Sequence, residues 1–234
     1  MPIDVANNIG EIVGAVGGLG LASYALVDAT KAGAKGGVSN SGFKFIEFAI
    51  KQLLPNEART DKLADAVQSR TLLDILHANW IGGMALSDQK AVAKSLIKLR
   101  LTPKTAAQFA TATNVAADLL TIVATKMSTG DDLSAAEVNV LGRFDLALTA
   151  LLDEGYQRAD QKYRNTTRVF AMMASIVIAI FGGWAVSANA DYFASKDLWI
   201  AFICGLLATP LAPISKDLAS ALQAGVKVAQ ATRK

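Results

Sequence analysis

The stretch SIVIAIFGGWAVSANADYFASKDLWIAFICGLLATPLAPI, from Ser175 to Ile214, decides the fold. It holds two long apolar runs, which a short polar segment with three charges separates. The first uncharged run covers residues 169–190, about 22 residues, and would extend about 33 Å as a helix. The hydrocarbon core of a bilayer is about 30 Å thick. This run is therefore long enough to cross a membrane.

The second uncharged run covers residues 198–215, about 18 residues, which is near the lower limit for a membrane span. Pro210 and Pro213 lie inside it, and a proline removes a backbone donor and crowds the preceding turn. We expect a kink or an early helix end near Thr209. A soluble core helix usually has a polar stripe, whereas the first run begins VFAMMASIVIAI, which only Ser175 interrupts. The two runs therefore predict a transmembrane helical hairpin.

A third apolar segment lies near the amino terminus. Residues 12–27 are uncharged, but they number only about 16, so the turn around Glu11 is needed to complete a span. We expect residues 1–30 to form a glycine-rich membrane helix. The alternative is a re-entrant or interfacial helix that packs against the hairpin.

Basic residues predict the orientation, because lysine and arginine collect on the cytoplasmic side of a membrane. They flank both ends of the hairpin and follow the first segment, whereas the loop of the hairpin has only Lys196. We expect the amino terminus and the loop at 188–196 to lie outside the cell. Residues 31–168 and the carboxyl terminus are expected in the cytoplasm. The expected location is the plasma membrane of a bacterium, its inner membrane.

Small residues in the first segment predict a helix-packing face. They recur at intervals of four on one side of a helix: Gly10, Gly14, Gly18 and Ala22. Glycine costs about 1 kcal/mol per residue in a helix relative to alanine, but it lets another helix approach closely. That helix belongs either to the protein's own hairpin or to a second copy. Ala221 and Gly225 belong to a similar row near the carboxyl terminus.

Glu11 is the charged residue closest to the glycine row. A carboxylate within a membrane segment is a candidate functional group, because such a charge is expensive in lipid. We therefore expect Glu11 to be a candidate ion or gating residue. A position near the membrane surface, where its side chain reaches the headgroups, is the alternative.

The rest of the chain also has helical patterns, so the expected fold class is an all-α integral membrane protein with a helical cytoplasmic domain. We expect six segments: a membrane helix (1–30), a linker and interfacial amphipathic helix (31–55), a helical cytoplasmic domain (56–133), a long helix that continues into a span (134–190), the loop and second span (191–215), and a cytoplasmic helix (216–234). For residues 43–54, a buried first helix of the soluble part is the alternative to the interfacial helix.

The long helix has a clear start signal, because Ser134 followed by Glu137 forms a capping box. Beyond it, apolar residues recur at spacings of three and four and form one stripe: Leu141, Phe144, Leu148, Leu152, Tyr156, Ala159 and Tyr163. The stripe packs either within the chain or between neighbouring subunits.

Several classes of chemistry lack the residues they need. Cys204 is the only cysteine and His77 the only histidine, which rules out an internal disulfide and a cysteine or histidine metal cluster within one chain. No spacing of carboxylates indicates an acid–base pair. We therefore expect no catalytic residue, no cofactor and no metal, and the protein is not expected to be an enzyme. The net charge of +3, without a long basic block, argues against a nucleic-acid partner.

The expected function follows from assembly in the membrane. We expect a homo-oligomeric multi-pass protein that acts as a structural scaffold or as a platform for a cytoplasmic protein partner. Its other expected partners are the lipid bilayer and further copies of itself. The alternative is an oligomeric pore or channel, either ion-conducting or holin-like.

Overall fold

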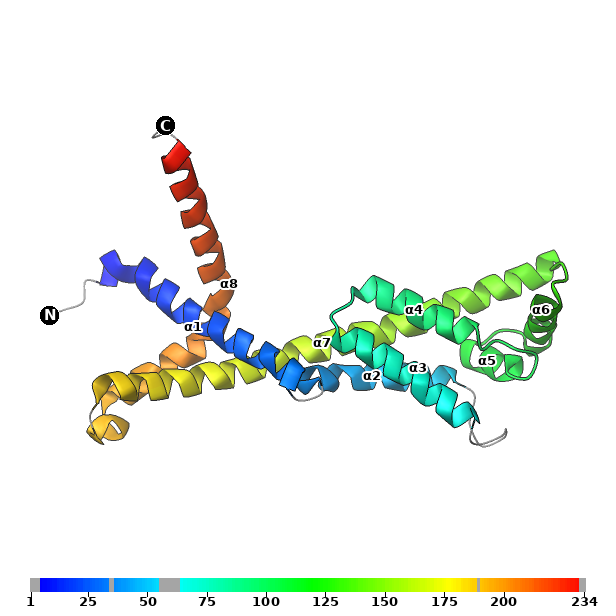
Figure 1. Ribbon diagram of the computed structural model, residues 1–234, viewed down its shortest axis with the longest axis horizontal. Helices are drawn as coiled ribbons and strands as arrows, with labels where there is room; N and C mark the ends of the chain where they lie inside the picture. Colours follow the sequence, from blue (N-terminus) through cyan, green and yellow to red (C-terminus); the bar gives the residue numbers. More distant parts are fainter. Residues whose placement is uncertain (1–4, 34–35, 55–63, 189, 232–234) are drawn as a thin grey trace. The chain divides into compact units, whose positions relative to one another are not determined.

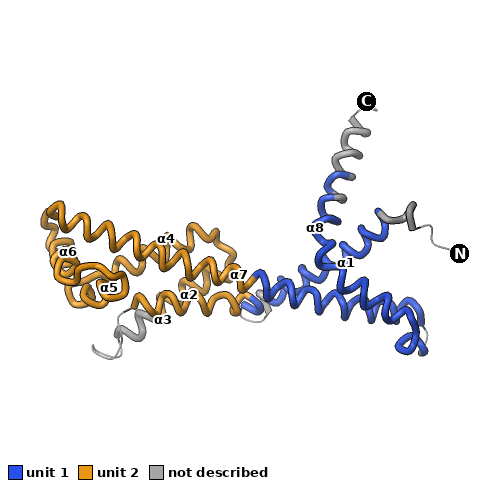
Figure 2. The backbone as a smooth tube through the Cα atoms, turned by 180° about the vertical axis from the view of Figure 1, so that it is seen from behind, with its two compact units in different colours: residues 1–38, 164–234 blue, residues 39–163 orange. Residues whose placement is uncertain are grey.

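The computed structural model describes residues 5–33, 36–54, 64–188 and 190–231. Within these ranges the chain forms helices joined by short turns and has no β-strand, so the all-α class predicted from the sequence is confirmed. The chain divides into two compact units, which Figure 2 colours separately. Unit 1 comprises residues 1–38 and 164–234, and unit 2 comprises residues 39–163.

Unit 2 is a bundle of helices, labelled in Figure 1. Its helices are α2 (Asn40–Leu53), α3 (Ala64–Ile81), α4 (Leu86–Lys98), α5 (Ala106–Thr113), α6 (Ala117–Thr129) and the first part of α7 (Ala135–Ser187). The short 3-10 helix η1 (Gly37–Ser39) precedes α2. The stretch after Ser134, in which the sequence has no strong helix breaker, is thus one helix of 53 residues.

Local sequence signals set several helix ends in unit 2. Asn114 ends α5 with a positive φ of 54°, and Gly130 ends α6 with a φ of 83°, a conformation that glycine adopts without strain. The predicted capping box is confirmed, because the Ser134 amide donates to Glu137 Oε2 at 2.7 Å and the Glu137 amide donates to Ser134 Oγ at 3.4 Å. A hydrogen bond from Lys126, together with that from the Ser134 amide, lowers the pKa of Glu137.

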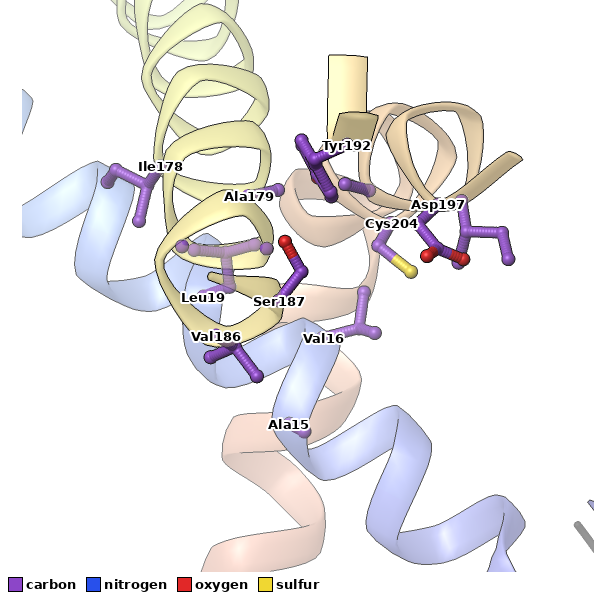
Figure 3. A pocket seen from close by; sticks show the side chains of 14 residues that line it. Ala15, Val16, Leu19, Ile178, Ala179, Val186, Ser187, Tyr192, Asp197 and Cys204 are labelled. Atoms are coloured by element: carbon purple, nitrogen blue, oxygen red, sulfur yellow. The ribbon is translucent and has the colours of Figure 1, made fainter. Parts of the chain in front are cut away.

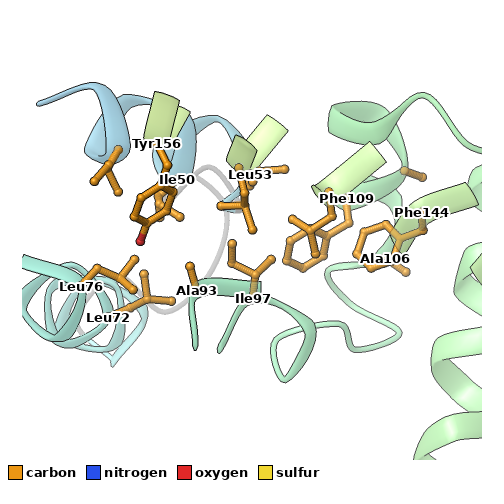
Figure 4. Close-up of a cluster of buried hydrophobic side chains, with 14 of the residues drawn as sticks. Ile50, Leu53, Leu72, Leu76, Ala93, Ile97, Ala106, Phe109, Phe144 and Tyr156 are labelled. Atoms are coloured by element: carbon orange, nitrogen blue, oxygen red, sulfur yellow. The ribbon is translucent and has the colours of Figure 1, made fainter. Parts of the chain in front are cut away.

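The core of unit 2 brings together side chains from α2, α3, α4, α5 and α7 (Figure 4). Phe109 and Phe144 meet edge to face, with ring centroids 5.9 Å apart. The apolar stripe of α7 faces this core, since these residues are at most 2% exposed: Phe144, Leu148, Leu152, Tyr156 and Ala159. The stripe therefore packs within the chain, which is one of the two arrangements that its spacing allowed.

Helix α2 also belongs to this core. Its buried residues are Phe43, Ile46, Ala49, Ile50 and Leu53, and the buried Trp80 of α3 donates its indole N–H to the Ser39 carbonyl beside them at 2.9 Å. Phe48, 63% exposed, lies on the opposite side of α2. Helix α2 is therefore a buried helix of unit 2, which matches the alternative that the sequence left open for residues 43–54.

Ion pairs connect α4 with α7. Lys94 lies 2.5 Å and Lys98 lies 2.9 Å from carboxylate oxygens of Asp145, and Lys90 lies 2.5 Å from Asp153. The three lysines share one face of α4 because they are four residues apart. Partial burial raises the pKa of Asp145, but the hydrogen bonds from the two lysines outweigh this effect and hold that pKa below its ordinary value.

Unit 1 contains α1 (Val5–Gly33), the later part of α7, the 3-10 helix η2 (Ala190–Ala194) and α8 (Lys196–Ala231). Among the described residues, three helices are long and apolar enough to cross a membrane: α1 over Gly10–Thr30, α7, and α8 over Lys196–Asp217. Their most apolar windows have mean hydropathies of 1.6, 2.2 and 1.9. The three apolar segments found in the sequence therefore all form helices of sufficient length.

The two prolines do not end α8. Pro210 and Pro213 both lie inside the helix, which continues to Ala231. Figure 1 shows α8 changing direction where it crosses α1, in keeping with the kink that prolines cause. Of the two expected outcomes near Thr209, a kink and an early end, the helix therefore shows the kink.

Candidate helix-packing surfaces and an apolar groove

Helices α1 and α8 make a close contact through two glycines of α1. A Cβ on Gly20 would overlap the carbonyl group of Ala208, and a Cβ on Gly17 would overlap the side chain of Ser215. The Ser215 hydroxyl donates to the Gly14 carbonyl oxygen at 3.3 Å. Because both glycines lack a side chain, the backbones of α1 and α8 can approach closely. Small residues have the same effect between membrane helices. We call Gly17 and Gly20 the packed glycines.

The hairpin formed by α7 and α8 has a similar contact. A Cβ on Gly205 would lie 2.5 Å from the Cα of Ile176, so only glycine fits at this position without a shift. The buried Ser175 hydroxyl donates to the Gly205 carbonyl oxygen at 2.7 Å. Ser175, which interrupts the apolar stretch VFAMMASIVIAI, therefore joins the two arms of the hairpin.

The glycine row predicted from the sequence lies on a different side of α1. A Cβ on Gly10, Gly14 or Gly18 would meet no atom within 4 Å, apart from its own helix, in the part of the chain that the structure describes. Ala22 is exposed. At 3.6 residues per turn, the centre of this row lies roughly 110° around the helix from the packed glycines. We call Gly10, Gly14, Gly18 and Ala22 the open row.

The remaining predicted residues are Glu11, Ala221 and Gly225. Glu11 is exposed and shares the face of the open row, because it lies seven residues from Gly18 and eleven from Ala22. Ala221 is exposed on α8. Gly225 lies within α8, but its surroundings are outside the described part of the structure.

An apolar groove of about 840 Å³ lies between α1, α7 and α8 in unit 1 (Figure 3). This volume is in the range of ~300–1,000 Å³ that is usual for small-molecule sites. Its walls are apolar or small side chains, among them Val16, Leu19, Ile178, Ile200 and Cys204. Gly182 also lines it and leaves it open, since this residue contributes no side chain.

The groove is polar at one end. Ser187 ends α7, Asp197 lies in the first turn of α8, and both line the groove near the hairpin loop. Tyr192 of η2 lines the same end, is 3% exposed and lies against Gly183. Its hydroxyl is buried without a hydrogen-bond partner among the described residues. Such a group usually has a structural or functional explanation, because a buried unpaired hydroxyl costs free energy.

Unit 2 has a smaller polar pocket of about 210 Å³ beside its single histidine. His77 lies with Nε2 2.8 Å from Asn40 Oδ1 and its ring 4.6 Å from that of Phe43, so its contacts are those of a packing residue. Glu47 and Asp74 also line the pocket. The described residues contain no group of three or more histidine, cysteine or acidic side chains that is suited to hold a metal ion.

The sequence did not reveal the packed glycines or the groove. Gly17 and Gly20 are three residues apart and lie beside the open row, which has the more regular spacing of four residues. Spacing alone therefore favours the open row, and not the packed glycines, for a close contact with α8. The groove needs residues from α1, α7 and α8 at once, and their juxtaposition depends on how the helices pack.

Comparison with protein-family models, curated proteins and solved structures finds no match for this chain. The fold and these surfaces therefore define the chain only as a helical protein with apolar helices of membrane-spanning length.

Proposed function

We propose that the chain is a multi-pass membrane protein that assembles with copies of itself through the open row of α1. In this proposal α1, the later part of α7 and the first part of α8 cross the bilayer. Unit 2 then serves as a scaffold or platform for a protein partner on the cytoplasmic side. We propose no catalytic activity, no cofactor and no nucleic-acid partner.

The exposure of the apolar helices supports the membrane location. Within their most apolar windows, only 22%, 11% and 28% of the residues are buried in α1, α7 and α8. Large apolar side chains that face outward include Phe170, Met173, Val177, Phe181, Trp199 and Ile203. Soluble monomers rarely expose such large apolar surfaces. In a bilayer, lipid tails would cover these side chains and remove their unfavourable contact with water.

The open row is the observation that carries the assembly proposal. The packed glycines already let α8 approach α1, and a Cβ at Gly10, Gly14 or Gly18 would meet no described atom outside its own helix. From this row, the backbone carbonyl of Gly14 takes part in the contact with α8, as the acceptor of the Ser215 hydroxyl. Each glycine weakens a helix by about 1 kcal/mol, so three glycines at open positions lower the stability of α1 unless another helix packs on them. A second copy of α1 would supply that helix, as in small-residue dimers of membrane helices.

The orientation in this proposal follows from the basic residues. With lysine and arginine on the cytoplasmic side, the amino terminus and the hairpin loop lie outside, and unit 2 and the carboxyl terminus lie inside. The bacterial inner membrane is the proposed location. Tight packing of α1 and α8 through Gly20 and Ala208 is compatible with two helices that cross the same bilayer.

An oligomeric pore is the second candidate, and the position of Glu11 favours it. Because Glu11 shares the face of the open row, assembly through this face would bring the Glu11 carboxylates of neighbouring copies together. Carboxylates gathered in a membrane segment are typical of ion pathways. This pore would be ion-conducting or holin-like, and it would need several copies to enclose a conduit.

The particle mass in mild detergent, measured by light scattering, tests the assembly. We expect a multiple of the 24.5 kDa chain mass for the natural protein and a smaller particle for Gly18→Leu and Ala22→Leu. Gly142→Leu is the matched control, because a Cβ at this open position of α7 also meets no atom within 4 Å. A monomeric natural protein, or an unchanged mass in both row variants, would refute assembly through this face. Ion leakage from liposomes then separates the two functions, since a pore leaks and a scaffold does not.

A further inference from the structure

The groove of unit 1 has the form of a site for a molecule with one apolar end and one polar end. On α8 the lining residues Asp197, Ile200, Ala201 and Cys204 recur at spacings of three and four, so they form one row along the helix. The row begins at the carboxylate and continues along apolar or small side chains. On α7 the polar Ser187 likewise lies at the loop end, and Ile178 and Ala179 lie two or more turns away from the loop, earlier in the helix (Figure 3).

The length of the groove corresponds to part of one bilayer leaflet. Asp197 and Cys204 are seven residues apart, or about 10 Å along the helix axis. Half of a ~30 Å hydrocarbon core is about 15 Å. If the hairpin crosses the membrane, the polar end lies near the headgroups on the side of the hairpin loop, and the apolar part extends among the acyl chains.

The charge at the polar end selects the headgroup. Asp197 is the one ionisable side chain, other than Tyr192 and Cys204, among the residues that line the groove. Its carboxylate attracts a cation and repels an anion. Tyr192 lines the same end, and its buried hydroxyl has no hydrogen-bond partner among the described residues.

We propose that this groove holds an acyl chain of a membrane phospholipid whose headgroup carries an ammonium group, with that ammonium beside Asp197. The inference rests on the membrane location in the proposed function but not on assembly. Such a lipid would fill the space between α1 and the hairpin and would thereby couple the membrane composition to the packing of α1. An acidic phospholipid without an ammonium group would place its net negative charge against the carboxylate.

Cys204 provides the readout, because it lines the groove and is the only cysteine of the chain. The full-length protein in detergent is treated with N-ethylmaleimide, and alkylation is followed by intact-protein mass. Dioleoyl phosphatidylethanolamine and dioleoyl phosphatidylglycerol are added at equal mole fractions. An ion pair near a surface contributes ~0.5–1 kcal/mol, so we expect the ethanolamine lipid to slow alkylation about two- to fivefold more than the glycerol lipid.

Two variants make the test specific. Asp197→Asn should remove the difference between the two lipids, whereas Asp217→Asn, which deletes an exposed carboxylate further along α8, should preserve it. Equal protection by both lipids, stronger protection by the glycerol lipid, or an unchanged preference in Asp197→Asn would overturn the proposal. Protection that increases with protein concentration and not with lipid would show that a second copy occupies the groove, which also overturns it. The particle mass of the same sample reports on assembly separately, so the two proposals can fail independently.

Discussion

The Ser175 hydroxyl donates a hydrogen bond of 2.7 Å to the carbonyl oxygen of Gly205, thirty residues further along the chain. Both residues lie inside apolar segments, and the contact joins the two arms of the hairpin at a point where Gly205 lets the backbones approach. In water, solvent molecules would compete with the Gly205 carbonyl for this hydroxyl. The hydroxyl also bonds to the Met172 carbonyl oxygen of its own helix at 2.8 Å. The bond to Gly205 is the one between the two helices, so it helps to fix how α7 and α8 pack.

Replacing Ser175 with alanine should therefore destabilise the hairpin. Interhelical hydrogen bonds of this kind contribute about 0.6 kcal/mol on average and up to ~1.7 kcal/mol. We expect Ser175→Ala to lower the free energy of unfolding by about 1 kcal/mol, measured by thermal unfolding in detergent. Ser220→Ala is the control, because this exposed hydroxyl bonds to Lys216 in its own helix. Equal effects in both variants would contradict a special role for Ser175.

Two glycines of α7 should respond in opposite directions to alanine. A Cβ on Gly142 meets no atom within 4 Å, so Gly142→Ala should stabilise unit 2 by up to about 1 kcal/mol through helix propensity. A Cβ on Gly155 would lie 2.7 Å from the Cβ of Ala49, so Gly155→Ala should destabilise the contact with α2 by ~1–3 kcal/mol. Chemical unfolding followed by circular dichroism measures both. Stabilisation by both variants would show that α2 does not pack against α7 in this way.

The same comparison applies to α1. Gly20→Ala should weaken the contact with α8, because the new methyl group would overlap the Ala208 carbonyl, whereas Gly18→Ala has free space within the chain. We expect a lower melting temperature in detergent for Gly20→Ala than for Gly18→Ala. The opposite order would mean that the open row, and not the packed glycines, contacts α8.

The pairs between α4 and α7 give unit 2 a dependence on pH. The pKa of Asp145 is lowered in the folded state, so its contribution to stability is complete above the unfolded pKa of about 3.9 and is lost as the pH falls through the folded value. Asp145 is partly exposed, so solvent screening limits this contribution to about 1 kcal/mol.

Asp145→Asn should therefore destabilise unit 2 at pH 7, and the difference from the natural protein should shrink below about pH 4. Urea unfolding at several pH values measures it. Glu154→Gln, which removes an exposed carboxylate paired with Arg158 in the same helix, is the control and should change stability little. A difference that stays constant down to pH 2 would show that the charge of Asp145 is not the cause.

The sequence was most informative where structure depends on local chemistry. Ser134 and Glu137 are three residues apart and form the predicted capping box, and the uncharged runs lie within helices long enough to cross a membrane. The sequence did not indicate which distant segments would be in contact. Lys90, Lys94 and Lys98 share one face of α4, but their partners follow 47–63 residues later, and nothing in the spacing identifies them.

The glycines of α1 show the same limit in another form. Spacing identifies a row that another helix can approach, but it does not say which glycines face a particular neighbour. That choice depends on the angle at which α8 crosses α1, and the prolines at 210 and 213 influence this angle. The groove is harder still to predict, because it is space left between α1, α7 and α8 and has no sequence pattern of its own.

The crossing of the membrane by the hairpin is tested most directly by the sidedness of single cysteines. In a Cys204→Ser background, Ala194→Cys places a thiol at the hairpin loop and Ser128→Cys places one in unit 2, both at exposed positions. In sealed vesicles of one orientation, a membrane-impermeant maleimide should label only one of these cysteines and should reach the other after the vesicles are opened. Labelling of both cysteines from the same side of intact vesicles would contradict a transmembrane hairpin.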